Sequence, residues 1–170
     1  MPIDDLSNPA PLAANGADWQ LFTDQVMGGV SRVTMVRETV ASRAAIRMRG
    51  DVSLENNGGF IQMRLDLHPN GSPFDASGFE GIEIDVCGNG ELYGLHLRTE
   101  DVTRPCQSHR QELWAHRIWQ TVQLPFSAFE PHRIDKPLDL RRLRRIGLAA
   151  IGRAFPGDLV ISRIASYGAA

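Results

Sequence analysis

This sequence of 170 residues has few cysteines, few lysines and almost no excess of one charge over the other. Two cysteines are too few for the disulfide framework of a small secreted domain, which predicts a cytoplasmic protein. Eighteen basic residues, of which only Lys136 is a lysine, stand against 20 acidic ones, for a formal net charge of −2. Because a general nucleic-acid binder needs a basic surface, we expect no nucleic-acid partner.

Long hydrophobic runs are also missing. No stretch approaches the ~18 apolar residues of a transmembrane helix, so we expect no membrane-spanning segment. The first 19 residues have neither a basic start followed by an apolar stretch nor an arginine, which argues against a secretory signal and a transit peptide. Residues 1–17 are rich in Pro, Ala and Asn without periodicity, which predicts a flexible N-terminal arm. Residues 18–170 are then expected to form a single β-sandwich domain.

Signatures of catalysis and of metal or cofactor binding are absent as well. The histidines have no paired spacing, the cysteines form no CxxC motif, and no GxSxG sequence occurs; we therefore expect no metal, no cofactor and no catalytic residue. Two alternatives stay open. Glu83 and Asp85, two apart on one strand, could serve as the carboxylate pair of a glycoside hydrolase, and Asp24, Glu55 and Asp158 could hold calcium.

What the sequence does have is alternation of apolar and polar residues. Residues 60–67, 82–86 and 92–99 each alternate with a period of two, the pattern of half-buried antiparallel strands. About ten such segments follow one another at the spacing of a sandwich or barrel. Only residues 138–144 look helical, over two turns at most. The sequence thus predicts an all-β antiparallel fold with about ten strands and one short helical turn.

The dipeptide Asn89-Gly90 predicts a two-residue hairpin turn, because both central positions of that turn favour positive φ. Such a turn would pair the flanking strands within one sheet and would face Glu83 with His96 on a polar surface. The opposite, apolar surface would consist of three cross-strand pairs: Val86 with Tyr93, Ile84 with Leu95, and Ile82 with Leu97.

Polar side chains would share one face of this sheet if the strand at 60–67 also belongs to it. Charged and amide groups on a concave face could bind a saccharide or another small polar ligand. The alternative is a solvated face whose cross-strand ion pairs are each worth a few tenths of a kcal/mol. The residues that we assign to this candidate ligand-binding face are Gln62, Arg64, Glu83, His96, Arg98 and His109.

Two glycine clusters form the second group of candidate residues. Neither has the spacing of a P-loop or of a dinucleotide-binding motif, and neither opens a predicted helix. Tight turns and bulges are the simpler interpretation. The residues of this motif, to which we assign a structural or binding role, are Asp24, Met27, Gly28, Gly29, Asn56, Asn57, Gly58 and Gly59.

Five stretches then occur in a recognisable order. They are Trp19, DQVMGGVS at 24–31, GDVSLENNGGFIQMR at 50–64, FEGIEIDVCGNGELYGLHLRT at 79–99, and WQTVQLPFSAF at 119–129. Over about residues 18–168 the chain resembles the family of the thirty-kilodalton complex I intermediate-associated protein. The combination of VMGGVS with ENNGGF at this separation is the specific part of the resemblance.

The resemblance implies a galactose-binding-domain-like jelly-roll sandwich, similar to carbohydrate-binding modules, and a non-enzymatic role. Mitochondrial members of the family act as assembly factors for respiratory complex I, which implies protein partners such as complex I subunits or assembly intermediates. This chain lacks a transit segment and the second, dinucleotide-binding domain of some relatives. These departures leave a carbohydrate or small polar ligand as the alternative partner, and a glycoside hydrolase-like enzyme as a third.

Overall fold

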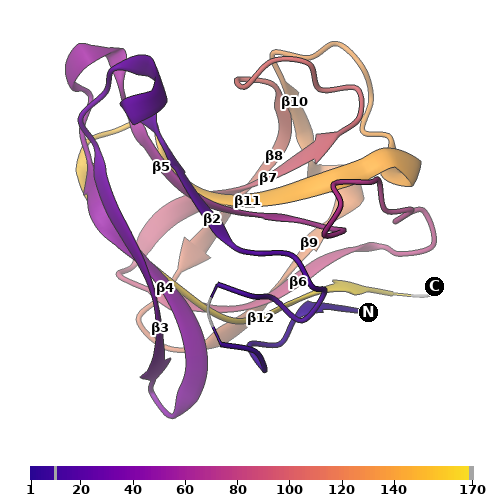
Figure 1. The fold of residues 1–170 in the computed structure, drawn as a ribbon, viewed down its shortest axis with the longest axis horizontal. Coiled ribbons are helices and arrows are strands. Elements are labelled where there is room, and N and C mark those ends of the chain that lie inside the picture. The colour runs from indigo at the N-terminus through magenta and orange to yellow at the C-terminus, as the bar shows by residue number, and fades with distance from the viewer. Residues whose placement is uncertain (10, 169–170) are drawn as a thin grey trace.

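The computed structural model describes residues 1–9 and 11–168 as two antiparallel sheets packed face to face (Figure 1). We name each sheet after one central strand. The β12 sheet has the order β3-β4-β12-β6-β9, with β1 also pairing to β12; its strands are β1 (Pro2–Asp4), β3 (Arg32–Val40), β4 (Arg43–Val52), β6 (Gly81–Gly88), β9 (Gln120–Pro125) and β12 (Phe155–Tyr167). The β11 sheet has the order β10-β8-β7-β11-β5-β2; its strands are β2 (Gln20–Thr23), β5 (Phe60–Asp66), β7 (Glu91–Thr99), β8 (Ser108–Ala115), β10 (Glu130–His132) and β11 (Leu143–Ile151).

Helical structure is limited to four short 3-10 turns within the described residues: η1 (Asp24–Met27), η2 (Glu55–Asn57), η3 (Phe126–Ala128) and η4 (Leu140–Arg142). The segment that looked helical, 138–144, contains η4, but β11 begins at Leu143. No helix within residues 1–9 and 11–168 has the length and apolarity needed to span a bilayer. The predicted all-β fold is confirmed, with 12 strands where we expected about ten.

The alternation of residue types sorts side chains between the core and the two outer surfaces. In β5, Ile61, Met63 and Leu65 are fully buried between the sheets, while Gln62 and Arg64 point outward. Burying each such aliphatic side chain contributes about 1.5–3 kcal/mol. The same pattern places His96 and Arg98 of β7 on the outer surface of the β11 sheet.

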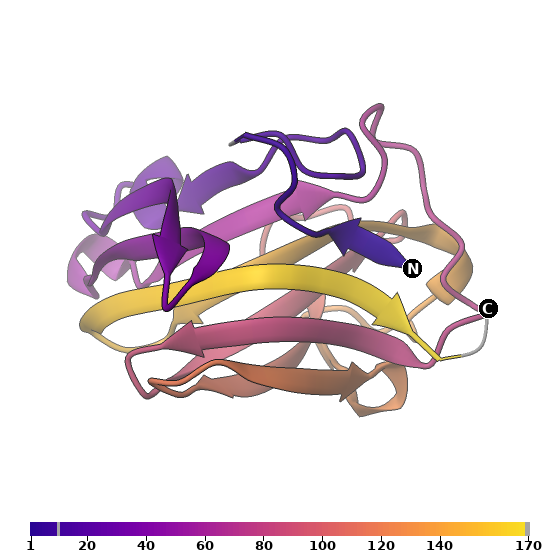
Figure 2. The same ribbon diagram turned by 90° about the horizontal axis from the view of Figure 1, so that it is seen from below.

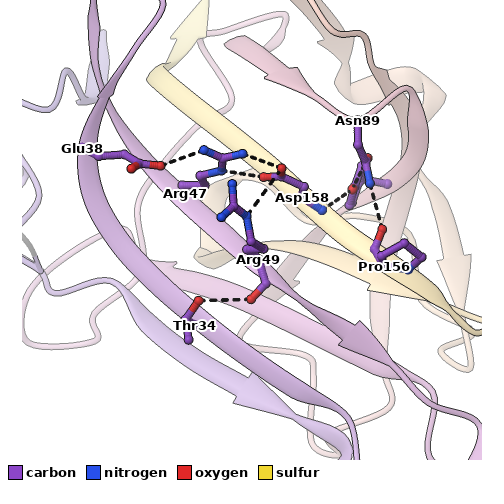
Figure 3. Close-up of polar contacts among 8 residues, drawn as sticks. Thr34, Glu38, Arg47, Arg49, Asn89, Pro156 and Asp158 are labelled. Carbon is purple, nitrogen blue, oxygen red and sulfur yellow. Dashed lines mark hydrogen bonds and ion pairs between the residues drawn. The ribbon is translucent and has the colours of Figure 1, made fainter.

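The hairpin predicted at Asn89-Gly90 is wrong. β6 pairs with β12 and β9, whereas β7 pairs with β11 and β8, so the turn carries the chain from one sheet to the other. Gly90 has a φ of +80°, but Asn89 is not among the residues with positive φ, which a two-residue type I′ hairpin requires. Asn89 instead accepts a hydrogen bond from the Tyr93 hydroxyl (2.7 Å) and donates one to the carbonyl of Pro156 (2.8 Å; Figure 3).

The reason for this error is that both strands do bury their apolar faces in one core. Alternation tells which face of a strand is buried, but two strands that face each other across a sandwich alternate in the same way as two neighbours in one sheet. The expected pairs of β6 with β7 residues therefore do not form.

Residues 1–9 and 11–17, within the predicted N-terminal arm, pack on the sandwich. β1 pairs with β12 (Figure 2), and the Asp4 carboxylate accepts a hydrogen bond from the Trp19 indole N–H at 2.7 Å. Ile3, Leu6 and Ala13 are buried in the core. These apolar residues are isolated among Pro, Asn and Asp, so the segment has no periodicity from which packing could have been predicted.

Candidate functional site

A pocket of about 260 Å³ lies on the outer face of the β11 sheet. In Figure 1 this sheet curves between the η1 and η2 loops on one side and the loops around β10 on the other. Four strands and the loop between β7 and β8 contribute side chains to the pocket. Its lining residues are Phe22, Gln62, Arg64, His96, Arg98, Thr103, Pro105, Gln107, Ser108 and Arg110.

Two glycines make room for the polar side chains of this pocket. Gly147 of β11 lies opposite Arg64 of β5 on one side and opposite His96 of β7 on the other. A Cβ at Gly147 would come within 2.4 Å of Nε2 of Gln62, and one at Gly94 within 2.9 Å of Nε2 of His96. The side chains of Gln62 and His96 thus lie over bare backbone, as a mid-strand glycine permits.

His96 is held neutral at physiological pH. Its residue is only 6% exposed, and burial, followed by the charges of Arg110, His132 and Arg98, lowers its pKa to about 3. Its Nδ1 lies 3.4 Å from Nε2 of Gln62. Because an amide nitrogen only donates, Nδ1 accepts, and the ring proton is on Nε2. Gln62 and His96 therefore form a fixed, uncharged pair.

Three arginines from three strands surround this pair. The Arg64 guanidinium lies 4.3 Å above the ring of Phe22. Arg98 donates from Nη1 to the carbonyl oxygen of Pro105 at 3.0 Å, and Nε of Arg110 donates to the hydroxyl of Ser108 at 2.7 Å. Burial is the first cause that lowers the pKa of each arginine, and nearby arginines are the second. All three remain charged, since guanidinium pKa values start above 12.

A second hollow, of about 610 Å³, adjoins the first on the same face. His96 and Arg110 line both hollows. The second one continues toward β10 and also contains Glu112 and Glu130, whose side chains are exposed. Trp114, 54% exposed, follows Glu112 on the outer face of β8. The face as a whole therefore offers a charged pocket, a mixed hollow and an exposed aromatic ring.

The structure brings together four of the six residues predicted for the ligand-binding face: Gln62, Arg64, His96 and Arg98. Glu83 lies on the outer face of the other sheet, where it accepts hydrogen bonds from Gln123 and Arg163. Its predicted position opposite His96 is wrong because β6 and β7 belong to different sheets.

His109 is also absent from the pocket. It pairs with the core residue Leu97 across β7 and β8, and its Nε2 lies 3.0 Å from the carbonyl oxygen of Lys136. It is buried rather than exposed on the outer face.

Phe22 and Arg110 are functional candidates that sequence reasoning missed. Arg110 follows His109 on β8 and lies directly opposite His96. The alternation along β8 therefore indicated that Arg110 points to the outer face, but not that His96 lies beside it. Phe22 lies opposite Gln62 on the edge strand β2. Only knowledge of strand order could have placed either residue beside Arg64.

The glycine motif forms a closed structure around the buried carboxylate of Asp24. Its Oδ1 accepts from the backbone N–H of Ser31 at 3.1 Å, and its Oδ2 accepts from the Ser31 hydroxyl at 2.5 Å and from the backbone N–H groups of Gly59 and Phe60 at 2.6 and 3.3 Å. Burial, the largest single effect, raises the pKa of Asp24, but the hydrogen bonds from Ser31, Gly59 and Phe60 together lower it below its usual value. The carboxylate therefore ties the η1 and η2 loops together.

Gly29 and Gly58 are required by the same contact, because a Cβ on either would come within 2.5 Å of the Asp24 carboxyl group. The two loops leave apolar side chains in solvent at one end of the sandwich. We call this set the apolar tip; its members and their exposed fractions are Val26 (65%), Met27 (60%), Val30 (41%) and Leu54 (51%).

The remaining acidic candidates are engaged elsewhere. Asp158 lies on the outer face of the β12 sheet and accepts two hydrogen bonds from Arg47, at 2.7 and 2.6 Å (Figure 3). It therefore does not approach Asp24, and the three residues considered for calcium are not brought together. Asp85 accepts from Thr121 on the same outer face. Within residues 1–9 and 11–168, no group of three or more His, Cys, Asp or Glu residues is arranged to hold a metal ion.

A family model described as Complex I intermediate-associated protein 30 matches residues 8–161. No curated protein matches the chain.

Solved structures with a similar fold include carbohydrate-binding modules. One is a family 11 module from Clostridium thermocellum in complex with a β-1,3-1,4-mixed-linked tetrasaccharide; it has a TM-score of 0.73 and 16% identity, over 99% of this chain and 95% of that one. Another is a family 30 module with a TM-score of 0.69 and 15% identity, over 100% and 90% of the two chains. At this identity the likeness concerns the fold, and it confirms the predicted galactose-binding-domain-like jelly-roll sandwich.

Proposed function

Because the chain belongs to the complex I intermediate-associated protein 30 family and has the fold of carbohydrate-binding modules, we propose that it is a non-catalytic binding module for a saccharide. The observation that carries this proposal is the pocket on the β11 sheet, in which Gln62, His96 and Arg64 converge beside Phe22. A ligand rich in hydroxyl groups needs such directed polar partners in a concave, partly aromatic site.

The second hollow and Trp114 support a ligand longer than one sugar unit. They extend the binding face from the pocket toward β8 and β10. An exposed indole ring offers apolar surface to the flat side of a sugar ring. The family 11 module that resembles this chain was solved with a bound tetrasaccharide, which makes oligosaccharides of that length suitable first probes.

A double variant tests this proposal. Arg64→Ala with His96→Ala should abolish binding of any oligosaccharide found by titration calorimetry, and the melting temperature should show that the domain still folds. The matched control is Arg49→Ala with His116→Ala, because both are exposed residues outside the pocket. Equal saccharide affinity in the double variant and the wild type would contradict the proposal.

A non-catalytic role is supported by the placement of the carboxylates. The residues that line the pocket include no Asp or Glu, whereas glycoside hydrolysis uses two carboxyl groups across the scissile bond. Glu112 and Glu130 in the second hollow are exposed, but a general-acid glutamate depends on burial to raise its pKa. Assay of oligosaccharide hydrolysis over days by the wild type should detect no release of reducing ends.

A protein partner is the second candidate, and the apolar tip favours it. The side chains of Met27 and Leu54 are exposed on loops that the Asp24 carboxylate holds in one arrangement. Exposed apolar groups gathered on a fixed surface are typical of protein interaction sites. Given the family, the partners to test are subunits or assembly intermediates of respiratory complex I, with the chain acting as an assembly chaperone.

Affinity purification from the native host tests this second candidate. Recovery of complex I subunits with the wild type, and their loss with Met27→Ser and Leu54→Ser, would support it. Val36→Ser is the control, because Val36 is 47% exposed on β3, away from the tip. The same recovery with both variants, or none with the wild type, would contradict an assembly role for the tip.

We also propose a reducing compartment, the cytoplasm. Cys87 is buried and Cys106 is exposed, and both are free thiols. An exposed unpaired cysteine is stable against oxidation where glutathione keeps thiols reduced.

A further inference from the structure

The pocket on the β11 sheet contains an excess of positive charge. Arg64, Arg98 and Arg110 line it together, and its lining includes no acidic residue. The ion pairs among the residues that the structure describes involve other arginines and Lys136. Half-buried arginines are normally paired with a carboxylate, because burying an unpaired charge is unfavourable. Three in one pocket therefore require an explanation.

Arg64 shows the imbalance most clearly. Its Nε–H is buried and has no hydrogen-bond partner. The nearby carboxylate of Asp66 is already engaged by Nε of Arg145 at 2.6 Å. A buried donor without an acceptor is unfavourable, and such a group calls for a missing ligand or a functional reason. No residue within the described ranges 1–9 and 11–168 supplies the acceptor that the Nε–H of Arg64 lacks.

The other two arginines are held in place by neutral groups. Arg98 donates from Nη1 to carbonyl oxygens of the β7–β8 loop, the best of them that of Pro105, and Arg110 donates to Ser108. These contacts fix each guanidinium without neutralising it. After burial, positive charges lower the pKa of each pocket arginine: Arg145 and Arg98 act on Arg64, Arg145 and Arg144 act on Arg98, and Arg133 acts on Arg110. The pocket therefore lies in a region with an excess of positive charge.

We propose that this pocket binds an oxyanion, a carboxylate or sulfate group, carried by the saccharide ligand. Guanidinium groups bind such groups through paired, charge-assisted hydrogen bonds. The neutral pair of Gln62 and His96 lies beside the arginines and is suited to hydroxyl groups of the same sugar unit. The identity of the carrier rests on the proposed saccharide-binding function, whereas the oxyanion site itself rests on the three arginines.

The two halves of the binding face differ in charge, which limits where the oxyanion can lie. The second hollow contains Glu112 and Glu130 as well as Arg153, and carboxylates there repel an anion. The ligand should therefore place its charged group at Arg64 and Arg98, and its uncharged units should extend past His96 toward Trp114.

Four probes test the inference by titration calorimetry: a tetrasaccharide with a single terminal uronate for a carboxylate, one with a single terminal sulfate ester, neutral cellotetraose, and inorganic sulfate alone. We expect at least one acidic tetrasaccharide to bind about tenfold or more tightly than cellotetraose, since charge-assisted hydrogen bonds are roughly twice as strong as neutral ones. Its affinity should fall with added salt. The NMR signal of the Arg64 Nε–H should move on binding.

Variants of Arg64 identify the site. Arg64→Gln should remove the preference for the acidic probe, and Arg64→Lys should keep part of it, because lysine retains the charge but not the paired donors. Arg32→Gln is the control, since it removes the same charge from an exposed position on β3. If Arg64→Gln fails to fold by thermal melting, Arg110→Gln replaces it.

The outcomes separate this inference from the function on which it partly rests. Equal affinity for cellotetraose and both acidic tetrasaccharides, unchanged in Arg64→Gln, overturns the oxyanion site and leaves saccharide binding intact. Binding of sulfate alone, lost in Arg64→Gln, with no saccharide bound, supports the oxyanion site and overturns the saccharide function. Binding of none of the four probes overturns both.

Discussion

The two outer faces of the sandwich both carry arginines, but the three that line the pocket on the β11 sheet form no ion pair with any residue that the structure describes. On the β12 sheet, Arg47 is held between Asp158 and Glu38 (Figure 3), and Arg163 pairs with Glu83. On the β11 sheet, Arg64 and its two neighbours contact carbonyl groups, a hydroxyl and an aromatic ring. The same residue type is thus used in two ways within one domain.

The direction of the pKa shifts separates the two faces. The hydrogen bonds that Arg47 donates to Asp158 are the largest cause that raises the pKa of Arg47, whereas burial lowers the pKa of Arg64. The paired face follows the ordinary rules for a stable surface, and the pocket face departs from them. Such departures are expected where a surface serves binding rather than folding.

Asp24 should give the largest loss of stability, because it joins the two sheets. The loops it ties connect β2 with β3 and β4 with β5, and each connection passes between the sheets. Asp24→Ala leaves the N–H groups of Gly59 and Ser31 without acceptors, and we expect a loss of about 3 kcal/mol in chemical denaturation. Asp51→Ala, at an exposed position of β4, should change stability little; a similar loss in both variants would contradict this account.

The pH dependence of the Asp24 contribution has a defined sign. Because the folded-state pKa is lowered, the unfolded state binds the proton more readily, and the contribution is full above the unfolded pKa of about 3.9. It is lost as the pH falls through the lower folded value. The difference in unfolding free energy between the wild type and Asp24→Ala should therefore shrink below about pH 4.

His96 should make the pocket face the more acid-sensitive of the two. Its folded pKa is about 3, and its unfolded pKa is about 6.5. Between these two pH values the imidazole is protonated in the unfolded state but not in the folded state. The free energy of unfolding therefore decreases as the pH is lowered from about 6.5 toward 3. We expect a loss of about 2 kcal/mol from pH 7.5 to pH 5. Denaturation of His96→Gln should lack this loss, while His116→Gln, at an exposed position, should retain it; parallel pH curves for all three would contradict the burial of a neutral His96.

Breaking an ion pair on the β12 sheet should have a smaller but clear effect. Asp158→Ala removes the carboxylate that accepts two hydrogen bonds from Arg47, and both side chains of this pair are mostly buried. The expected loss is about 1–2 kcal/mol, and saccharide affinity should not change. A change in affinity without a change in stability would show that the two faces are not separate in function.

Removing an arginine from the pocket should cost the least stability. Arg64→Gln deletes a buried donor that has no partner, so we expect a change in unfolding free energy within about 0.5 kcal/mol, in contrast to a loss on Arg47→Gln. Thermal and chemical denaturation of the two variants measure this directly. If Arg64→Gln is the more destabilising of the two, the pocket arginines serve the fold, and the distinction between the faces is lost.

Sequence reasoning found the strands and the outward residues, but not which strands are neighbours. Alternation indicated the polar side of each strand, and we expected Gln62 and Arg64 to share a face with His96 and Arg98 if the strand at 60–67 belongs to the same sheet. It did not indicate the strand that lies between them. That strand, β11, joins the two pairs through Gly147. Strand order depends on long-range packing, which local patterns do not encode.

The same limit explains what was misplaced. Glu83 has the right period and charge for the polar face, but its strand lies in the opposite sheet. The sequence predicted that the motif glycines form tight turns. It did not predict their common contact, Asp24, which lies up to 35 residues away in sequence. Periodicity left a choice between a sandwich and a barrel, and the family resemblance predicted the sandwich.

The two glycines beneath Gln62 and His96 have a practical consequence for redesign. They make the floor of the pocket a stretch of main chain, so its depth depends on a single carbon atom at Gly94 or Gly147. Gly147→Ala would displace the side chain of Gln62, and Gly94→Ala would displace that of His96. Ligand size could thus be selected at one edge of the pocket at a time, with every charge left in place.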